Sequence, residues 1–256
     1  MVIEKIRTAV WFAQRPSHWH HAISLTKRKF QTDRDAPHLR EKARAWAANE
    51  AVPLAEALGR VGIKGDLRAF DTELMSEGAE LAAKANMKMG GAGDLELLSN
   101  AVRLTKASRI VESGVAYGWS SLAILDALEH NGCGGQLISV DMPYPKMGNE
   151  DFVGIVVPGR LRRQWTLIRQ PDRPGLAKAI ALHEGCIDLC HYDSDKSWWG
   201  RAYGFPLLWD ALVQGGLFIS DDIQDNMYFA EFAKSKDVPF AVTASQGKFV
   251  GLIRKV

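Results

Sequence analysis

The pattern of apolar and polar positions divides the chain into two parts. From about residue 109 onward, short apolar runs alternate with amphipathic stretches, as in a doubly wound parallel sheet. The apolar runs predict strands near 109–113, 136–140, 165–169, 186–192 and 216–220. The stretches between them predict helices near 118–130, 174–184, 201–213 and 225–235. We therefore expect an α/β fold built on parallel strands.

The end of the chain departs from this alternation. Residues 238–243 and 248–253 are rich in strand-forming side chains, and the short polar segment 244–247 between them contains a glycine. Two such runs joined in this way predict an antiparallel hairpin. The parallel sheet is thus expected to finish with an antiparallel pair.

Residues 1–90 have a different character, because they lack runs rich in valine and isoleucine and are helix-like throughout. The segment 41–58 is the strongest helix prediction. A glycine-rich turn at 90–93 leads to Asp94, a good N-cap for a helix that begins at Leu95. We expect residues 1–90 to form a helical N-terminal cap and residues 91–256 to form the second, α/β domain.

The net charge and the cysteine content indicate which partners and which cellular location to expect. The net charge of +2 gives no overall field that would attract nucleic acid. The chain has three cysteines, Cys133, Cys186 and Cys190, an odd number that is low for a chain of this length. Such usage is typical of reduced thiols and not of a disulfide framework, and it favours the cytoplasm. We expect no membrane span, since no apolar run approaches the required length of about 18 residues, and no secretory leader.

A glycine turn follows the first predicted strand. Gly114 and Gly118 allow the backbone to turn tightly and to approach a ligand, and the next helix directs free N–H groups at an anion. Glu112 stands just ahead of the turn, where it would repel a pyrophosphate but attract the ammonium and sulfonium of S-adenosylmethionine. The Ser120 hydroxyl and the helix N-terminus would then bind the carboxylate of the cofactor. A tight turn without a ligand is the alternative.

Asp141 closes the second predicted strand. A carboxylate at this place can accept hydrogen bonds from both ribose hydroxyls of either a dinucleotide or S-adenosylmethionine. The residue therefore supports a nucleoside-containing cofactor without identifying it.

Acidic side chains follow two further strands, with Asp193 after one and Asp221 and Asp222 after the other. Carboxyl ends of parallel strands meet at one edge of a sheet, so we expect these acids to lie together. Hard carboxylate oxygens suit Mg²⁺ or another hard divalent cation, which would acidify and orient a hydroxyl substrate. N-capping of the following helices is the alternative role for the acids.

Lys196 lies three residues after Asp193. It is a candidate general base if burial and a neighbouring cation lower its pKa. The alternative is a surface lysine paired with Asp195. Both roles stay open at this point.

Four segments together resemble a known family: the turn at 111–120, Asp141, the segment 187–198 and the run 215–222. They are similar to class I S-adenosylmethionine-dependent O-methyltransferases, in particular to the cation-dependent group that includes catechol, caffeoyl-CoA, macrolide and aminocoumarin sugar O-methyltransferases. The likeness covers about residues 86–256. It implies a Rossmann-like seven-stranded sheet of order 3-2-1-4-5-7-6 and Mg²⁺ ligation by the three aspartates. For the adenine it implies contacts from Gln170 or Asp172 together with Ser194.

The resemblance implies an enzyme that transfers a methyl group from S-adenosylmethionine to a hydroxyl of a small molecule or sugar. Lys196 matches the catalytic lysine of the catechol group, whereas Asp221-Asp222 resembles the sugar enzymes, so the acceptor stays open. The alternatives are a hydroxylase-like relative with changed chemistry and a non-catalytic module that binds the cofactor. Assembly into a homo-oligomer is also left open.

Overall fold

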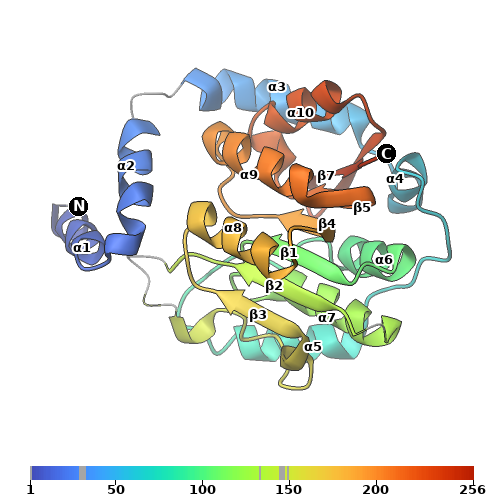
Figure 1. Ribbon diagram of the computed structural model, residues 1–256, viewed down its shortest axis with the longest axis horizontal. Helices are drawn as coiled ribbons and strands as arrows, with labels where there is room; N and C mark the ends of the chain where they lie inside the picture. Colours follow the sequence, from blue (N-terminus) through green and yellow to red (C-terminus); the bar gives the residue numbers. More distant parts are fainter. Residues whose placement is uncertain (1, 29–32, 133, 144–147, 149) are drawn as a thin grey trace.

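The computed structural model describes residues 2–28, 33–132, 134–143, 148 and 150–256. Its strands form a seven-stranded sheet of order β3-β2-β1-β4-β5-β7-β6 (Figure 1). Strands β1 to β5 pair in parallel, and β7 is antiparallel to both β5 and β6. The strands are β1 (Arg109–Ser113), β2 (Gln136–Val140), β3 (Trp165–Ile168), β4 (Ile187–Tyr192), β5 (Leu212–Ser220), β6 (Phe240–Ser245) and β7 (Lys248–Arg254). The expected fold and strand order are confirmed.

Helices cover both faces of the sheet, because its strands carry apolar side chains on both sides. On β1, Ile110 packs into a core with α4 (Leu54–Arg60), α6 (Leu95–Thr105) and α7 (Trp119–Asn131). The next residue, Val111, faces the opposite core. That core is formed with α3 (Pro37–Glu50), α8 (Asp172–Leu182), α9 (Trp198–Ala211) and α10 (Tyr228–Lys236). The expected layers are therefore present, with helix and strand ends within a few residues of the predicted ones.

The closing hairpin has a tighter turn than the four-residue loop that the sequence predicts. Strand β6 continues to Ser245 and β7 begins at Lys248, which leaves only Gln246 and Gly247 between them. Both residues have positive φ, of 51° and 77°, as a two-residue hairpin turn of the primed type requires. The turn brings Lys248 to the start of a strand beside β5.

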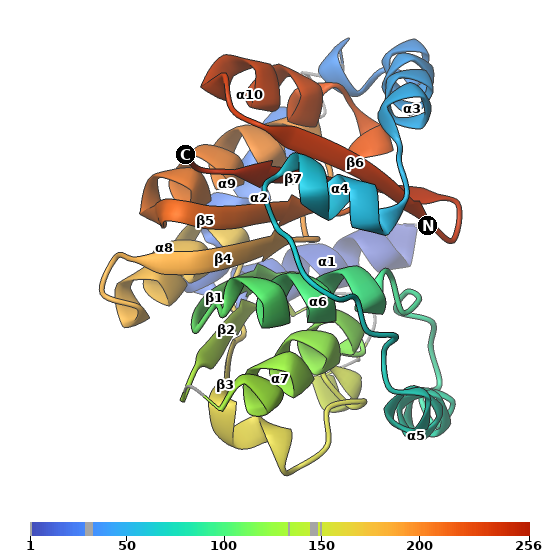
Figure 2. The same cartoon turned by 90° about the vertical axis from the view of Figure 1, so that its right-hand side faces the viewer.

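The single helix predicted over 41–58 is wrong, because the structure has two helices there, α3 and α4. Between them, Val52 donates its backbone N–H to the carbonyl of Val242 at 2.9 Å, and Ala51 forms a parallel bridge to the same residue of β6. Pro53 also favours extended backbone at the residue before it. Figure 2 shows α4 lying beside β6 and β7 after this break.

The N-terminal part is not uniform in its packing. Helices α1 (Val2–Ala13) and α2 (Trp19–Arg28) lie at one side of the molecule in Figure 1. By contrast, Ala47 of α3 and Leu58 of α4 are fully or almost fully buried in the two cores of the sheet. The division at residue 90 stays a prediction. Within the described ranges, no helix is both long and apolar enough to cross a membrane.

The remaining helical segments are short or peripheral. They are α5 (Thr72–Ala82) and the 3-10 turns Pro16–His18, Asp33–Asp35, Glu150–Phe152, Leu161–Gln164 and Ile223–Asp225.

Candidate functional site

Two cavities lie where the parallel strands end. The first has a volume of about 220 Å³ and is lined from α2, α8 and α9 by residues that include His21, Asp172 and Tyr203. The second, of about 160 Å³, is lined by the segment 89–94 and by Ser120, Asp193, Lys196, Asp221 and Lys248. Gly114, Asp141 and Ser194 line both cavities, so the two adjoin at the carboxyl edge of the sheet. This is where open α/β sheets bind ligands.

Gly114 permits the close approach of two strand ends. Its φ is 89°, and a Cβ at this position would lie 2.3 Å from the backbone oxygen of Asp193. The neighbouring backbones are joined directly, since Asp193 donates its N–H to the carbonyl of Ser113 at 2.7 Å. The absence of a side chain at Gly114 therefore allows the acid after β4 to sit against the turn after β1.

A glycine is required at position 118 by a close approach of two chain segments, whereas the sequence predicted a contact with the cofactor. Gly118 has a φ of 92°, and a Cβ there would lie 2.8 Å from the Cα of Gly154. It lines neither of the two cavities, whereas Ser120, in the first turn of α7, lines the second. Gly118 thus admits a neighbouring chain segment, and its predicted contact with the cofactor stays a prediction.

Asp141 holds the turn in place. Its Oδ2 accepts hydrogen bonds from the backbone N–H groups of Val115 and Ala116 at 2.8 and 3.0 Å. Its Oδ1 pairs with Arg169 at 2.6 Å. Asp141 is 4% exposed and lines both cavities at their junction. Its predicted role in ribose binding stays a prediction, to which the structure adds support of the glycine turn.

Glu112 lies in the core beneath the glycine turn, and its predicted contact with the cofactor stays a prediction. Glu112 has no exposed surface and lines neither cavity. Its Oε2 accepts hydrogen bonds from the hydroxyls of Ser121 on α7 and Ser139 on β2. The side chain points into the core beneath the turn because β1 alternates its faces and Glu112 shares the face of Ile110. The acid beside the turn therefore belongs to a buried network.

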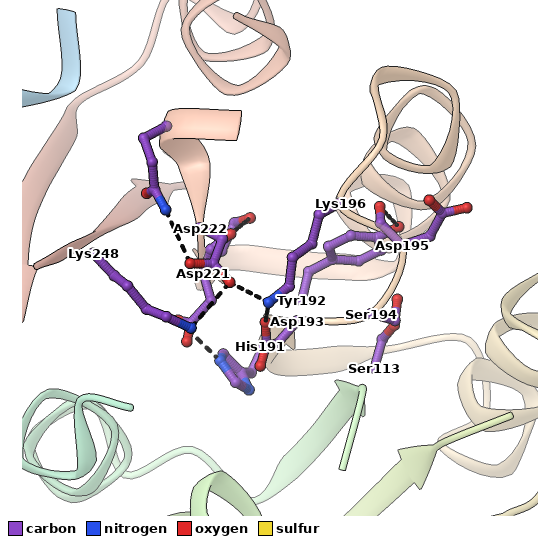
Figure 3. A network of polar contacts seen from close by, with 12 residues as sticks. Ser113, His191, Tyr192, Asp193, Ser194, Asp195, Lys196, Asp221, Asp222 and Lys248 are labelled. Atoms are coloured by element: carbon purple, nitrogen blue, oxygen red, sulfur yellow. Dashed lines mark hydrogen bonds and ion pairs between the residues drawn. The ribbon is translucent and has the colours of Figure 1, made fainter. Parts of the chain in front are cut away.

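Figure 3 shows the acids at the carboxyl edge together with two lysines. Lys196 Nζ lies 3.0 Å from Asp193 Oδ1 and also pairs closely with Asp222 Oδ2. Lys248, from the start of β7, approaches the same oxygen of Asp222 at 3.2 Å. Lys196 is thus placed between two acids and not on the surface with Asp195. N-capping does not explain Asp193, since Ser197 caps α9 by accepting the N–H of Gly200.

The charges of this cluster set its protonation. Burial, and next the negative charge of Asp221, raise the pKa of Asp193 to about 6 although Lys196 and His191 oppose this shift. Burial alone would lower the pKa of Lys196, but Asp193 and Asp222 outweigh it and raise that pKa above its ordinary value. Lys196 is an ammonium in this arrangement. The condition for a general base, a lowered pKa, is therefore not met while Asp193 and Asp222 hold the ammonium.

The residues can be tested as ligands of the divalent cation that the family resemblance implies. Across the described ranges, no three His, Cys, Asp or Glu side chains are placed closely enough to form a metal centre. Asp193 and Asp221 nevertheless line one cavity with oxygen donors, and Asp222 stands beside them. The Lys196 ammonium bridges two of these acids and stands in for a cation there. The donor chemistry therefore fits a hard divalent ion.

Asp172 and Ser194 meet in the first cavity, at the place expected for adenine. The Ser194 hydroxyl donates to Asp172 and lies against the hydroxyl of Ser113. Burial raises the pKa of Asp172 to about 6 despite these hydroxyl contacts. Of the two candidates after β3, Asp172 lines the first cavity and Gln170 lines neither of the two, and the predicted adenine contacts of both stay predictions.

Sequence reasoning missed several residues of the site. Lys248 gave no local signal, because a lysine that begins a hairpin strand is usually a solvated one. His21 and Tyr203 come from helices whose placement no short motif predicts. His191 was part of a recognised segment but had no role assigned, and it lies buried between two carboxylates.

Comparison with known proteins agrees with this geometry. Residues 111–223 match the family model described as a methyltransferase domain. No curated protein sequence matches the chain.

Three solved structures share the fold. An O-methyltransferase from Bacillus cereus in complex with S-adenosylhomocysteine is 15% identical, with a TM-score of 0.55 over 82% of this chain and 100% of its own. The O-methyltransferase TomG from Streptomyces achromogenes, in complex with S-adenosylmethionine, is 17% identical, with a TM-score of 0.53 over 79% and 96%. A methyltransferase from Podospora anserina bound to S-adenosylhomocysteine is 17% identical, with a TM-score of 0.56 over 78% and 96%. Residues 111–223 are thus similar to a methyltransferase domain, and the chain as a whole has the fold of these three methyltransferase structures.

Proposed function

We propose that this protein transfers a methyl group from S-adenosylmethionine to a hydroxyl of a small molecule or sugar. The observation that carries the proposal is the pair of adjoining cavities that share Gly114, Asp141 and Ser194. One cavity suits a nucleoside, and the other ends at the acids and lysines. A cofactor bound across both would present its reactive carbon beside the groups that can hold a hydroxyl.

The first cavity would take the nucleoside of the cofactor. Asp172 and Ser194 offer polar atoms to adenine, and Asp141 at the junction is the acid for the ribose. The methionine part would lie in the second cavity, where Ser120 and the N-terminus of α7 attract a carboxylate. Held this way, the sulfonium lies near the acidic edge, and positioning of the two reactants supplies much of the rate.

Asp193, Asp221 and Asp222 are the proposed ligands of Mg²⁺ or another hard divalent cation. When bound, such an ion would acidify the acceptor hydroxyl and fix its oxygen. Lys196 is the proposed general base, and its Nζ can accept a proton only in a state in which Asp193 and Asp222 no longer hold the ammonium. In the structure at hand Lys196 serves to neutralise the acids.

Calorimetry with S-adenosylhomocysteine tests the cofactor part. We expect binding, and we expect the variant Ser194→Ala to weaken it because Ser194 lines both cavities. Ser235→Ala is the matched control, since the Ser235 hydroxyl donates within α10 to Phe232, away from the cavities. A wild-type protein that binds no S-adenosylhomocysteine would end the methyltransferase proposal.

A second experiment tests the cation and the acceptor. Transfer of a labelled methyl group to catechol and to sugar hydroxyls is measured with Mg²⁺ and with a chelator present. We expect transfer only with the cation, and loss of it in Asp193→Ala. Transfer that is unaffected by the chelator would remove the cation from the proposal and leave the methyl transfer standing.

We also infer a cytoplasmic location from the cysteines. Cys186 and Cys190 are free thiols, the first exposed and the second buried, whereas Cys133 lies outside the described residues. Activity retained in a thiol-reducing buffer is the expected result.

A further inference from the structure

A histidine links the core of the sheet to the acidic edge. His191 lies on β4, where it is in register with Glu112 of β1 on one side and Ile219 of β5 on the other. Its side chain is 1% exposed. His191 Nδ1 lies 3.5 Å from Glu112 Oε1, and His191 Nε2 lies 3.3 Å from Asp221 Oδ1 (Figure 3 shows His191 and Asp221). One ring therefore touches a buried acid and an acid of the site.

The buried end of this link is firmly held. Glu112 Oε2 accepts the hydroxyls of Ser121 and Ser139, and Ser139 in turn accepts the indole N–H of Trp165 at 2.8 Å. These contacts come from three elements and leave Glu112 Oε1 directed at His191. Glu112 Oε1 and His191 Nδ1 are both buried without a well-formed hydrogen bond, so their mutual attraction is what offsets their desolvation.

The other end of the link is open to the cavity. Asp221 follows β5, and its backbone N–H donates to the carbonyl of Tyr192 at 3.0 Å. The side chain is 13% exposed and lines the second cavity. Its Oδ2 faces the segment with Gly93, where a Cβ would lie 3.6 Å away. With Oδ1 held by His191, the rotation of the carboxylate is determined and Oδ2 is the oxygen left for a ligand.

We propose that His191 is a positioning residue, anchored by Glu112, that sets the orientation of the Asp221 carboxylate at the acceptor end of the site. The role given to Asp221 rests on the proposed function. The contacts of His191 with Glu112 and Asp221 do not depend on that function. His191 is buried and lines neither of the two cavities at the carboxyl edge. It acts through Asp221 by fixing a donor oxygen before a ligand arrives, which lowers the cost of ordering that ligand.

The test uses two kinds of variant, because removal of the imidazole alone would leave Glu112 buried and unpaired. The double variant Glu112→Gln/His191→Phe removes the link and both of its buried charges. The single variant His191→Gln keeps a side chain with N–H donors at the same place. Crystal structures report the orientation of Asp221, calorimetry with Mn²⁺ reports the affinity of the acidic edge for a hard cation, and calorimetry with S-adenosylhomocysteine reports the cofactor site.

We expect Asp221 to turn away in the double variant and the affinity for Mn²⁺ to fall by about tenfold or more. Binding of S-adenosylhomocysteine by His191→Gln should stay within about twofold of wild type, since His191 lines neither of the two cavities. His191→Gln should recover part of the Mn²⁺ affinity, which a purely structural role would not produce. If the double variant fails to fold, His191→Gln decides: a Mn²⁺ affinity below that of wild type supports the positioning role, and a wild-type affinity together with a wild-type Asp221 orientation overturns it.

Two outcomes separate this inference from the proposed function. An unchanged Asp221 orientation in the double variant overturns the positioning role, whatever the activity of the enzyme. A wild-type protein that binds S-adenosylhomocysteine but no Mn²⁺ removes the cation from the proposed function, and the crystal structures then decide the role of His191 by themselves.

Discussion

Gly114→Ala is expected to disturb stability and cofactor binding together. The residue has a φ of 89°, and a Cβ there would lie 2.3 Å from the oxygen and 2.6 Å from the carbon of the Asp193 carbonyl. These neighbours are backbone atoms and cannot rotate out of the way. The methyl group must therefore push the end of β1 from the end of β4, at the wall that both cavities share.

Gly185 provides a matched control for the magnitude. It has a similar φ of 80°, but a Cβ at Gly185 would meet nothing within 4 Å. Gly185→Ala should cost about 1 kcal/mol for the left-handed backbone alone. Gly114→Ala adds overpacking of about 1–3 kcal/mol, so its total should reach roughly 2–4 kcal/mol. For a chain of this size, each kcal/mol lowers Tm by about 2–4 °C.

Urea and thermal unfolding followed by circular dichroism measure both variants against the wild type. Calorimetry with S-adenosylhomocysteine should show binding at least about tenfold weaker for Gly114→Ala and unchanged for Gly185→Ala. Equal destabilisation by the two substitutions would contradict the argument from the contact with Asp193. Wild-type affinity in Gly114→Ala would refute the placement of the cofactor along this turn.

Three further predictions concern other parts of the molecule. His21→Ala should weaken the binding of S-adenosylhomocysteine by about three- to tenfold in calorimetry, because His21 lines the first cavity. An unchanged affinity would exclude α2 from the site. The folded-state pKa of Asp172 is raised from 3.8 to about 6, so its ionisation destabilises the folded protein increasingly as the pH rises from about 4, and in full above about 6. Urea unfolding should therefore show that the stability gained by Asp172→Asn over wild type grows between about pH 4.5 and pH 8, to at most about 3 kcal/mol; a gain that is smaller at the higher pH than at the lower would contradict this sign. Pro53→Ala should leave the helical circular dichroism signal unchanged, since Val52 still pairs with Val242; a gain of helix would show that proline alone separates α3 from α4.

The sequence pattern predicted the secondary structure correctly where interactions between residues close in sequence determine it. The strand β1 and the strand β2 have the predicted bounds, because an apolar run between polar turns has one low-energy place in a buried parallel sheet. The N-cap at Asp94 is confirmed by its hydrogen bond from the N–H of Leu97 at 3.0 Å. The same local logic failed over 41–58, where pairing with a strand almost 200 residues away interrupts the helix.

The candidate site was predicted in part for a related reason. Because β4 and β5 are parallel, Asp193, Asp221 and Asp222 all lie at the carboxyl edge of the sheet. They are close together because β4 and β5 are neighbours in the sheet. The direction of a side chain depends on depth and register as well. Pairing of β1 with β4 sets Glu112 against His191 in the core, and its expected contact with the cofactor stays a prediction.

The sequence by itself therefore determined the class of fold, the succession of strands and the edge at which the chemistry gathers, because these depend on periodicity and on the direction of the chain. Only the tertiary structure decided which charges meet there. Lys248 reaches Asp222 because an antiparallel hairpin places β7 beside β5, and His191 reaches Asp221 across two neighbouring strands. Such contacts arise from register and packing between distant segments, which no single stretch of sequence contains.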